Sequence, residues 1–289
     1  PGPGAATSRA RPSGSRPRCG PRRCVNRRND EALALLGGGA SPLVELVLRL
    51  QRAMDLATLG RLDDLDRELT TCRLLAAEVR SPELSAQVGY TEAGLAMLRA
   101  QWDRALALGR RATEEITRTS RPDAPWSVFA ARWGVLHARG RSGELAAELL
   151  EVAADPAFTS LRAAAAVAVL DAGDEAGARD LAARWFEPPP EDWTWMVQVA
   201  CWAELSARIG APDPAVLRDL LLPCSGLLAV AGSVLDCGGS VDALLAGLSL
   251  RLGDVEEARR HAVAAQRQET TLGLRAWHDR TAGLVAATR

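Results

Sequence analysis

A break in helical periodicity recurs about every forty residues along this chain, and no other feature of the sequence restricts the fold as strongly. Each break lies between two stretches in which apolar residues recur with helical spacing. The central residues of the breaks are separated by 40, 40, 33, 37 and 43 positions, and they are Gly60, Ala100, Gly140, Gly173, Gly210 and Gly253. This pattern predicts a series of helical hairpins.

Glycine suits such a break because it adopts positive φ without steric cost, which ends one helix and lets the chain turn into the next. The residue five positions later is predicted to face the partner helix, and this place is taken by Leu65, Ala105, Leu145, Ala178 and Ala258. Ala and Leu dominate the apolar residues, which also favours helix. The predicted helices span residues 42–58, 62–79, 82–99, 102–118, 125–138, 143–154, 156–171, 174–186, 191–209, 214–231, 239–251, 254–271 and 274–287.

A single hairpin cannot bury its apolar face, so neighbouring hairpins must stack. The sequence therefore predicts an all-α fold over residues 41–289, a right-handed superhelix of stacked antiparallel helix pairs, or tetratricopeptide-like α-α solenoid. Residues 1–40, rich in Pro, Gly, Ser and Arg, are predicted to form a disordered leader. Its arginines would attract nucleic acid, but we favour a solvated tail. The chain does not begin with Met, so a fragment of a longer protein is one of the possibilities we consider.

The absence of lysine limits the chemistry that this chain can perform. All 35 of its Lys or Arg positions are arginine, so a P-loop lysine and a Schiff-base lysine are excluded, and we expect no nucleotide hydrolysis and no cofactor. His137, His261 and His278 lack the spacing of metal-binding helices, and Ser225 and Ser240 lack a nucleophile-elbow motif. We interpret one acidic run as a solvated helix face: Asp63, Asp64, Asp66 and Glu68. We therefore predict no catalytic or metal site.

The compartment follows from three features of the sequence. The six cysteines are too scattered for a disulfide framework, which indicates a reducing environment. No apolar run reaches the length of about 18 residues that a membrane span needs, and no signal-peptide core precedes Ala32. We expect a cytoplasmic protein that does not bind membranes.

The helical repeats resemble tetratricopeptide-type repeats, most clearly at Leu252-Gly253-Asp254-Val255-Glu256-Glu257-Ala258-Arg259-Arg260-His261. A larger block from Leu220 to Trp277, with Gly60-Arg61-Leu62-Asp63 and Trp102-Asp103-Arg104-Ala105 earlier in the chain, resembles the C-terminal helical-repeat region of actinobacterial MalT-like or AfsR-like regulatory ATPases of the LuxR or BTAD type. The resemblance spans about Pro42 to Ala287. It implies a sensor region that itself binds no DNA, because the family's P-loop and helix-turn-helix motifs are not found here.

Tryptophan pairs are the candidate binding residues. Trp126 and Trp133, like Trp195 and Trp202, stand seven residues apart, so each pair shares one helix face. In a tetratricopeptide-like superhelix the first helices line the concave surface, which predicts a groove for a protein segment or small effector, with Arg132 and Arg139 at its rim. The alternative, which we favour, is that these rings fill gaps between Ala-rich helices.

The function predicted from the sequence is that of a non-catalytic scaffold that binds a protein segment or effector, as the sensor part of a transcriptional regulator whose nucleotide-binding module lies elsewhere. Two alternatives stay open. One is a stand-alone tetratricopeptide adaptor that bridges two proteins. The other, from a different class, is an α-helical enzyme with an unrecognised site. The oligomeric state and the activating signal cannot be inferred from these residues.

Overall fold

The computed structural model describes residues 27–36, 41–119 and 124–288, and most of these residues are helical. The first 26 residues of the predicted leader lie outside this part of the chain. The α-helices are α2 (Arg27–Leu36), α3 (Pro42–Thr58), α4 (Leu62–Val79), α5 (Pro82–Leu98), α6 (Trp102–Ile116), α7 (Ala124–Ala138), α8 (Ala146–Ala153), α9 (Arg162–Asp171), α10 (Glu175–Trp185), α11 (Trp195–Ile209), α12 (Pro214–Leu221), α13 (Val241–Arg251), α14 (Val255–Leu272) and α15 (Arg275–Ala287). Short 3-10 helices are η2 (Ser142–Leu145), η3 (Pro156–Leu161) and η4 (Leu222–Cys224), and the strands are β1 (Leu228–Ala231) and β2 (Asp236–Ser240).

The predicted breaks are confirmed as helix ends of a common type. All six central residues have positive φ, from 56° at Ala100 to 94° at Gly173. At the first break, the Gly60 N–H donates to the Ala57 carbonyl at 2.9 Å and the Arg61 N–H donates to the Leu56 carbonyl at 2.8 Å. This two-bond Schellman pattern satisfies carbonyls that the helix end would leave unpaired. The same pattern closes the helices at Ala100, Gly140, Gly173 and Gly253.

The residues five positions after these breaks are buried, as predicted: Leu65, Ala105, Leu145, Ala178 and Ala258 are each at most 2% exposed. They lie where the second helix of a pair contacts its neighbours. Consecutive helices pack against one another in the pairs α3–α4, α5–α6, α9–α10 and α13–α14. The hairpin unit predicted from the sequence is therefore present in both halves of the described chain.

A buried β-hairpin interrupts the helices where the sequence predicted helix as far as residue 231 and again from 239. Strands β1 and β2 are antiparallel and pair Val230 with Cys237 and Ala231 with Asp236, with an irregularity between Leu228 and Val230. The prediction of helix is wrong here because the run from Leu227 to Ala231 is apolar throughout and buried on both faces. A run of that kind does not alternate between apolar and polar residues, so its pattern cannot distinguish a strand from a buried helix.

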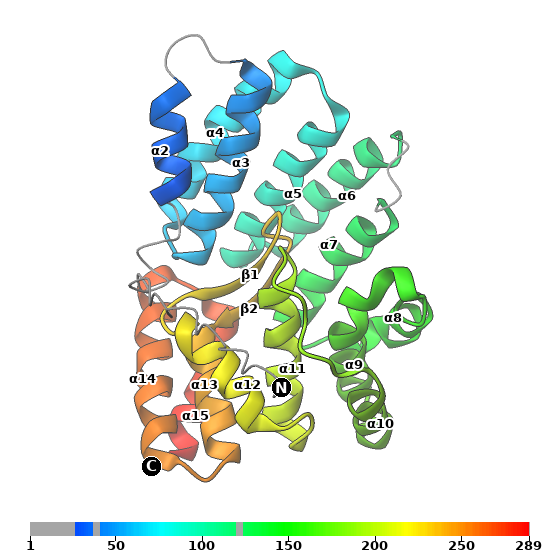
Figure 1. Ribbon diagram of the computed structural model, residues 1–289, viewed down its shortest axis with the longest axis vertical. Coiled ribbons are helices and arrows are strands. Elements are labelled where there is room, and N and C mark those ends of the chain that lie inside the picture. The colour runs from blue at the N-terminus through cyan, green and yellow to red at the C-terminus, as the bar shows by residue number, and fades with distance from the viewer. Residues whose placement is uncertain (1–26, 37–40, 120–123, 289) are drawn as a thin grey trace, which may run out of the picture.

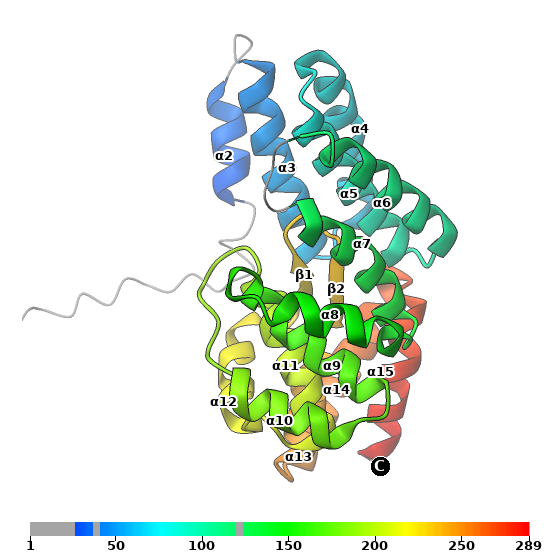
Figure 2. The same cartoon turned by 90° about the vertical axis from the view of Figure 1, so that its right-hand side faces the viewer.

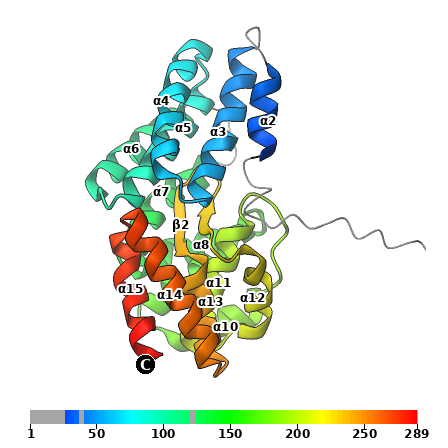
Figure 3. The same ribbon diagram turned by 90° about the vertical axis from the view of Figure 1, so that its left-hand side faces the viewer.

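The hairpin lies between two groups of helices and contributes side chains to the cores of both. Figure 1 shows β1 and β2 between α2–α6 at one end and α9–α15 at the other, and Figures 2 and 3 show the same arrangement from the sides. Leu228 and Val230 belong to the core formed with α3–α7 and α15, whereas Ala229 and Ala231 belong to the core formed with α7–α13. Alternate side chains of one strand thus join the two cores, as the period of a β-strand requires.

Two glycines make room for the tip of the hairpin. A Cβ at Gly94 in α5 would lie 2.0 Å from the Val234 carbonyl oxygen, and a Cβ at Gly134 in α7 would lie 2.2 Å from the Leu235 carbonyl oxygen. Val234 itself has a φ of 62°, which is unusual for a β-branched residue. The tip is therefore held in a strained conformation by helices that approach its backbone closely.

Two further expectations need correction. Residues 27–36, predicted to belong to the disordered leader, form helix α2, which packs on α3; Asn29 Nδ2 donates to Asp55 at 2.7 Å. Glu68, placed on a solvated face, is 5% exposed, because Arg49 and Arg52 of α3 donate to its carboxylate and allow it to be buried. A helix with the apolar length needed to cross a bilayer is absent from the part of the chain described above.

Candidate functional site

The predicted tryptophan groove is wrong for two of its members. Trp133 and Trp202 are 3% and 2% exposed, and both belong to the core shared by α7–α13. Trp195 is half-buried against the same core. Trp126 lies in α7, but its side chain is outside the described residues. Trp133, Trp195 and Trp202 thus pack toward neighbouring helices, as the alternative interpretation expected.

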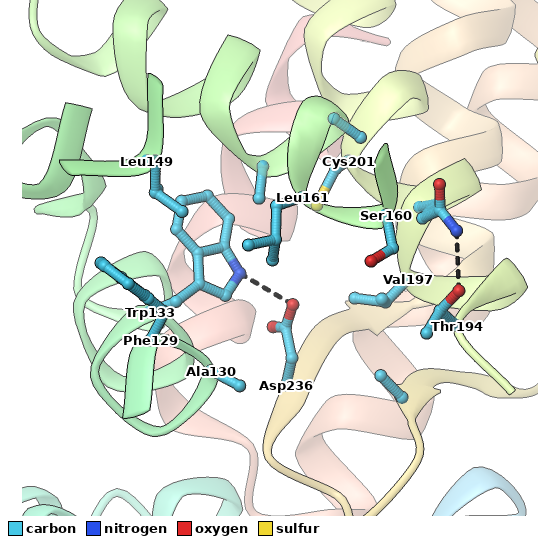
Figure 4. A pocket seen from close by; sticks show the side chains of 14 residues that line it. Phe129, Ala130, Trp133, Leu149, Ser160, Leu161, Thr194, Val197, Cys201 and Asp236 are labelled. Carbon is cyan, nitrogen blue, oxygen red and sulfur yellow. Dashed lines mark hydrogen bonds between the residues drawn. The ribbon is translucent and has the colours of Figure 1, made fainter. Parts of the chain in front are cut away.

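The predicted rim arginines do not join these tryptophans in a site. Arg132 is exposed and forms an ion pair with Glu148 at 2.9 Å, and Arg139 is exposed beyond the end of α7. Figure 4 shows the space next to Trp133, a cavity of about 20 Å³ between α7, η3, α9, α11 and the hairpin. A cavity of this size has room for about one water molecule. It therefore does not qualify as a site for an organic ligand.

A buried polar network begins at Trp133 and connects α7 to α11 and the hairpin. The Trp133 indole stacks on the His137 ring with centroids 4.7 Å apart, and its N–H donates to Asp236 Oδ2 at 2.7 Å. His137 Nε2 lies 2.7 Å from Glu204 Oε2, while its Nδ1 is 3.9 Å from Asp236, beyond hydrogen-bond distance. Arg280 of α15 donates to the His137 carbonyl.

The electrostatics of this network favour an ion pair. Burial disfavours charge on both His137 and Glu204, but the attraction between them outweighs burial, so the pKa of His137 is raised to about 10 and that of Glu204 is lowered to about 2. Arg208 and Arg280, with nitrogens 3.6 and 4.0 Å from Glu204, add to the attraction. The imidazolium is therefore fixed between carboxylates and is not poised to exchange protons near neutral pH.

A second polar cluster has the residue types of a hydrolase triad but not their order. Ser225 Oγ donates to Asp242 at 2.9 Å, and His261 Nδ1 lies 2.6 Å from the same carboxylate oxygen. The carboxylate thus stands between the serine and the histidine, whereas nucleophilic catalysis requires the imidazole next to the hydroxyl. The Gly226 N–H also donates to Asp242, at 2.6 Å. The cluster fixes the loop after η4 to α13 and α14.

A cavity of about 210 Å³ lies beside the network and is lined by residues of α11, α13, α14, α15 and β2. Three of its lining residues, Glu204, Arg208 and Arg280, also belong to the network. Another three bring polar atoms that are fully buried: Glu269 of α14, and Trp277 and Thr281 of α15. The remaining wall is apolar or small and includes Ala207, Ala243, Leu244, Gly247 and Leu284. We call this space the Glu269 cavity.

The buried polar atoms of the Glu269 cavity lack hydrogen-bond partners among the described residues. They are both carboxyl oxygens of Glu269, the indole nitrogen of Trp277 and the hydroxyl of Thr281. Burial raises the pKa of Glu269 to about 7, and the nearby Thr281 hydroxyl, His278 and Ser240 amide offset only part of this effect. An unpaired polar atom in a protein interior costs about 1–3 kcal/mol. Glu269 is 0% exposed, so its carboxyl group lies behind the accessible wall of the cavity.

Sequence reasoning missed these residues, although α14 carries a signal for one of them. Its buried stripe runs through Ala258, Ala262 and Ala265, and Glu269 is the next residue on that stripe at helical spacing. A carboxylate on an apolar stripe indicates a paired or functional charge. Trp277 and Thr281 are one helical turn apart and share a face of α15, but nothing in the sequence shows that this face meets Glu269.

The described ranges contain no group of three His, Cys, Asp or Glu side chains placed to hold a metal ion. Comparison with known proteins does not assign this chain to a family. No protein-family model matches the chain, and no curated protein is significantly similar to it.

Proposed function

We propose that this protein is a non-catalytic scaffold that binds a small effector in the Glu269 cavity and serves as the sensor part of a regulator. The observation that carries the proposal is a cavity of about 210 Å³ whose apolar wall also carries the charged side chains of Glu204, Arg208 and Arg280. Ligand sites combine an apolar wall with a few well-placed polar groups, and this cavity has both. Its volume suits a small metabolite better than a peptide.

The contacts of the cavity support a sensor role because they extend to distant parts of the chain. Arg280 lines the cavity and also donates to His137, 143 residues earlier. Glu204 lines the cavity and contacts the same histidine, which lies against the hairpin carboxylate Asp236. A ligand that moves Arg280 or Glu204 therefore acts on the network that joins α7, α11 and the hairpin.

The wider context is part of the same proposal. We place the helix pairs in a tetratricopeptide-like superhelix and the nucleotide-binding module of the regulator outside the residues printed here, in accord with the repeat resemblance. The four cysteines described, Cys72, Cys201, Cys224 and Cys237, are free thiols, which supports a reducing compartment such as the cytoplasm.

The test is a thermal-shift measurement on the full chain with a panel of small metabolites, followed by calorimetry on any that stabilise it. We expect at least one compound to raise the melting temperature, since a ligand that binds only the folded state stabilises it. Ala243→Leu, which fills the cavity, should abolish the shift. Ala286→Leu on the exposed side of α15 is the matched control and should retain it. A panel without any ligand sensitive to Ala243→Leu would refute the proposal.

A further inference from the structure

Three charged side chains line the accessible part of the Glu269 cavity: Glu204 and Arg208 of α11 and Arg280 of α15. The side chains of Arg208 and Arg280 are 41% and 38% exposed, so a bound molecule can contact their guanidinium groups. Glu204 lies between them, with Oε1 3.6 Å from Arg208 and 4.0 Å from Arg280. These three side chains therefore decide which charge a ligand of the cavity can carry.

Both arginines retain hydrogen-bond donors for a ligand. Arg208 uses one nitrogen for Asp171 at 2.6 Å, and Arg280 uses one for the His137 carbonyl. Each guanidinium has five N–H groups in a planar fork that matches the geometry of a carboxylate. Hydrogen bonds between charged partners are about twice as strong as neutral ones. Two guanidinium groups at one cavity therefore favour an anion.

Glu204 limits this anion to a single negative charge. Its Oε2 lies 2.7 Å from His137 Nε2, and the attraction of His137 lowers the pKa of Glu204 to about 2, so its carboxylate stays ionised. A carboxylate that already faces an imidazolium and two guanidinium groups has little attraction left for a cationic ligand. It also repels a second negative charge on an anion bound between the same arginines. One carboxylate group therefore suits this cavity better than an amine or a phosphate.

The rest of the accessible wall suits a short apolar body. It is formed mainly by small or aliphatic side chains, among them Ala207, Ala243, Leu244 and Leu284. Burial of each methylene group on such a wall strengthens binding by about fourfold. The volume of about 210 Å³ is below the roughly 300–1,000 Å³ of sites for drug-sized ligands. The ligand is therefore a molecule of few carbons.

We infer that the ligand of the Glu269 cavity is a small aliphatic monocarboxylate, whose carboxylate lies against the guanidinium groups of Arg208 and Arg280 and whose carbon chain lies on the apolar wall. The polar atoms of Glu269, Trp277 and Thr281 do not contact it, because they are buried behind that wall. This inference rests on the proposed function, which requires only that the cavity binds some small effector.

The test is calorimetric titration of the full chain with straight-chain acids from propanoate to hexanoate. Hexanamide and hexylamine are the neutral and cationic analogues of the longest acid, and inorganic phosphate is the anion without an apolar body. The titrations are made at pH 6.0, where Glu269, whose pKa is raised to about 7, is mostly uncharged and does not repel the acid. We expect the affinity to rise about fourfold with each added methylene. Hexanoate should bind about tenfold more tightly than hexanamide, hexylamine or phosphate.

Two variants assign the contacts of the carboxylate. Arg208→Gln and Arg280→Gln each keep an amide donor, so both should fold, which circular dichroism checks. Each should reduce the preference for hexanoate over hexanamide by about fivefold or more, because the contact with a charged donor is lost. Arg275→Gln at the exposed start of α15 is the matched control and should bind like the unmodified chain. The comparison of hexanoate with its analogues on the unmodified chain tests the inference even if a variant does not fold.

The outcomes separate the inference from the proposed function, because Ala243→Leu should abolish binding of any ligand of the cavity. The monocarboxylate inference is wrong if hexanamide or hexylamine binds as tightly as hexanoate, if both glutamine variants keep the preference for the acid, or if only a metabolite of another class binds. The effector-binding function stands in each of these cases, provided that Ala243→Leu abolishes the binding observed. If neither these probes nor the metabolite panel binds in a manner sensitive to Ala243→Leu, both are wrong.

Discussion

The indole nitrogen of Trp133 lies 2.7 Å from a carboxylate oxygen of Asp236, a residue 103 positions later in the chain. This contact joins a helix of the first half of the protein to the β-hairpin in the second half, inside the core. Trp133 is therefore both a packing residue and the only partner that the structure shows, among the described residues, for that oxygen of Asp236.

Truncation of the buried tryptophans distinguishes a core role from a groove role. We expect Trp133→Ala and Trp202→Ala each to lower the free energy of unfolding by about 3–5 kcal/mol, because each empties a packed site. Urea denaturation followed by circular dichroism measures this loss. Trp193→Ala is the comparison, and it should cost less, since Trp193 is 55% exposed. Losses below about 1 kcal/mol at Trp133 and Trp202 would favour the groove interpretation over the core interpretation.

The glycines that receive the hairpin tip should not tolerate even a methyl group. Gly94→Ala and Gly134→Ala would place Cβ atoms 2.0 and 2.2 Å from backbone oxygens, so we expect losses of about 1–3 kcal/mol or more in unfolding free energy. Gly283→Ala in α15 is the matched control, because its Cβ would meet nothing within 4 Å. That variant should be stabilised by roughly 0.5–1 kcal/mol. Equal effects at all three positions would contradict the inserted position of the tip.

Stability should fall as pH rises from about 4.5 to about 7 because of Glu269. Its pKa is raised in the fold, so the folded state holds the proton more tightly than the unfolded state, and this advantage is complete below about pH 4.5 and gone above about pH 7. The loss is on the order of 3 kcal/mol. Glu269→Gln should remove this slope in denaturation curves measured at pH 5, 6 and 7. A slope that persists in the variant would mean that Glu269 is not the titrating group.

A second decline in stability, above pH 6.5, is expected from His137. Its pKa is raised to about 10 in the fold, so its contribution is complete below about pH 6.5 and is lost progressively as pH rises toward 10. The informative window is pH 6.5 to 8.5, because the buried thiols of Cys201 and Cys237, whose pKa values burial raises, add to the loss at higher pH. His137→Gln should be less stable at pH 6.5 and should show a flatter dependence over this window. A parallel curve for the variant would contradict the ion pair with Glu204.

Ala100 occupies a break position that otherwise holds glycine, and its φ of 56° is costly for a residue with a Cβ. We expect Ala100→Gly to raise the free energy of unfolding by about 0.5–1 kcal/mol. Gly173→Ala is the reciprocal change, at a position where a Cβ would meet nothing within 4 Å, and should lower it by a similar amount. Thermal melts of both variants measure how much positive φ destabilises a residue that has a Cβ. A loss of stability in Ala100→Gly would contradict this cost.

The sequence predicted the local helical structure well, but it did not predict the Glu269 cavity. Helices such as α3, α4 and α7 begin and end within two residues of their predicted bounds, because Schellman breaks and prolines are encoded locally. The hairpin could not be predicted, since the run from Leu227 to Ala231 lacks alternation. The Glu269 cavity could not be predicted either, because it depends on how α11, α13, α14 and α15 meet. Tryptophan spacing could not show that Trp133 and Trp202 point into the core.

The hairpin has a consequence for the synthesis of this protein. Leu228 and Val230 are part of the core of helices that begin at Pro42, nearly two hundred residues earlier. While the chain emerges from the ribosome, those early helices expose apolar surface at least until residue 240 has been made. Ribosome stalling or proteolysis before that point leaves an N-terminal product whose core lacks its strands. Such a product has the exposed apolar surface that chaperones bind and that drives aggregation.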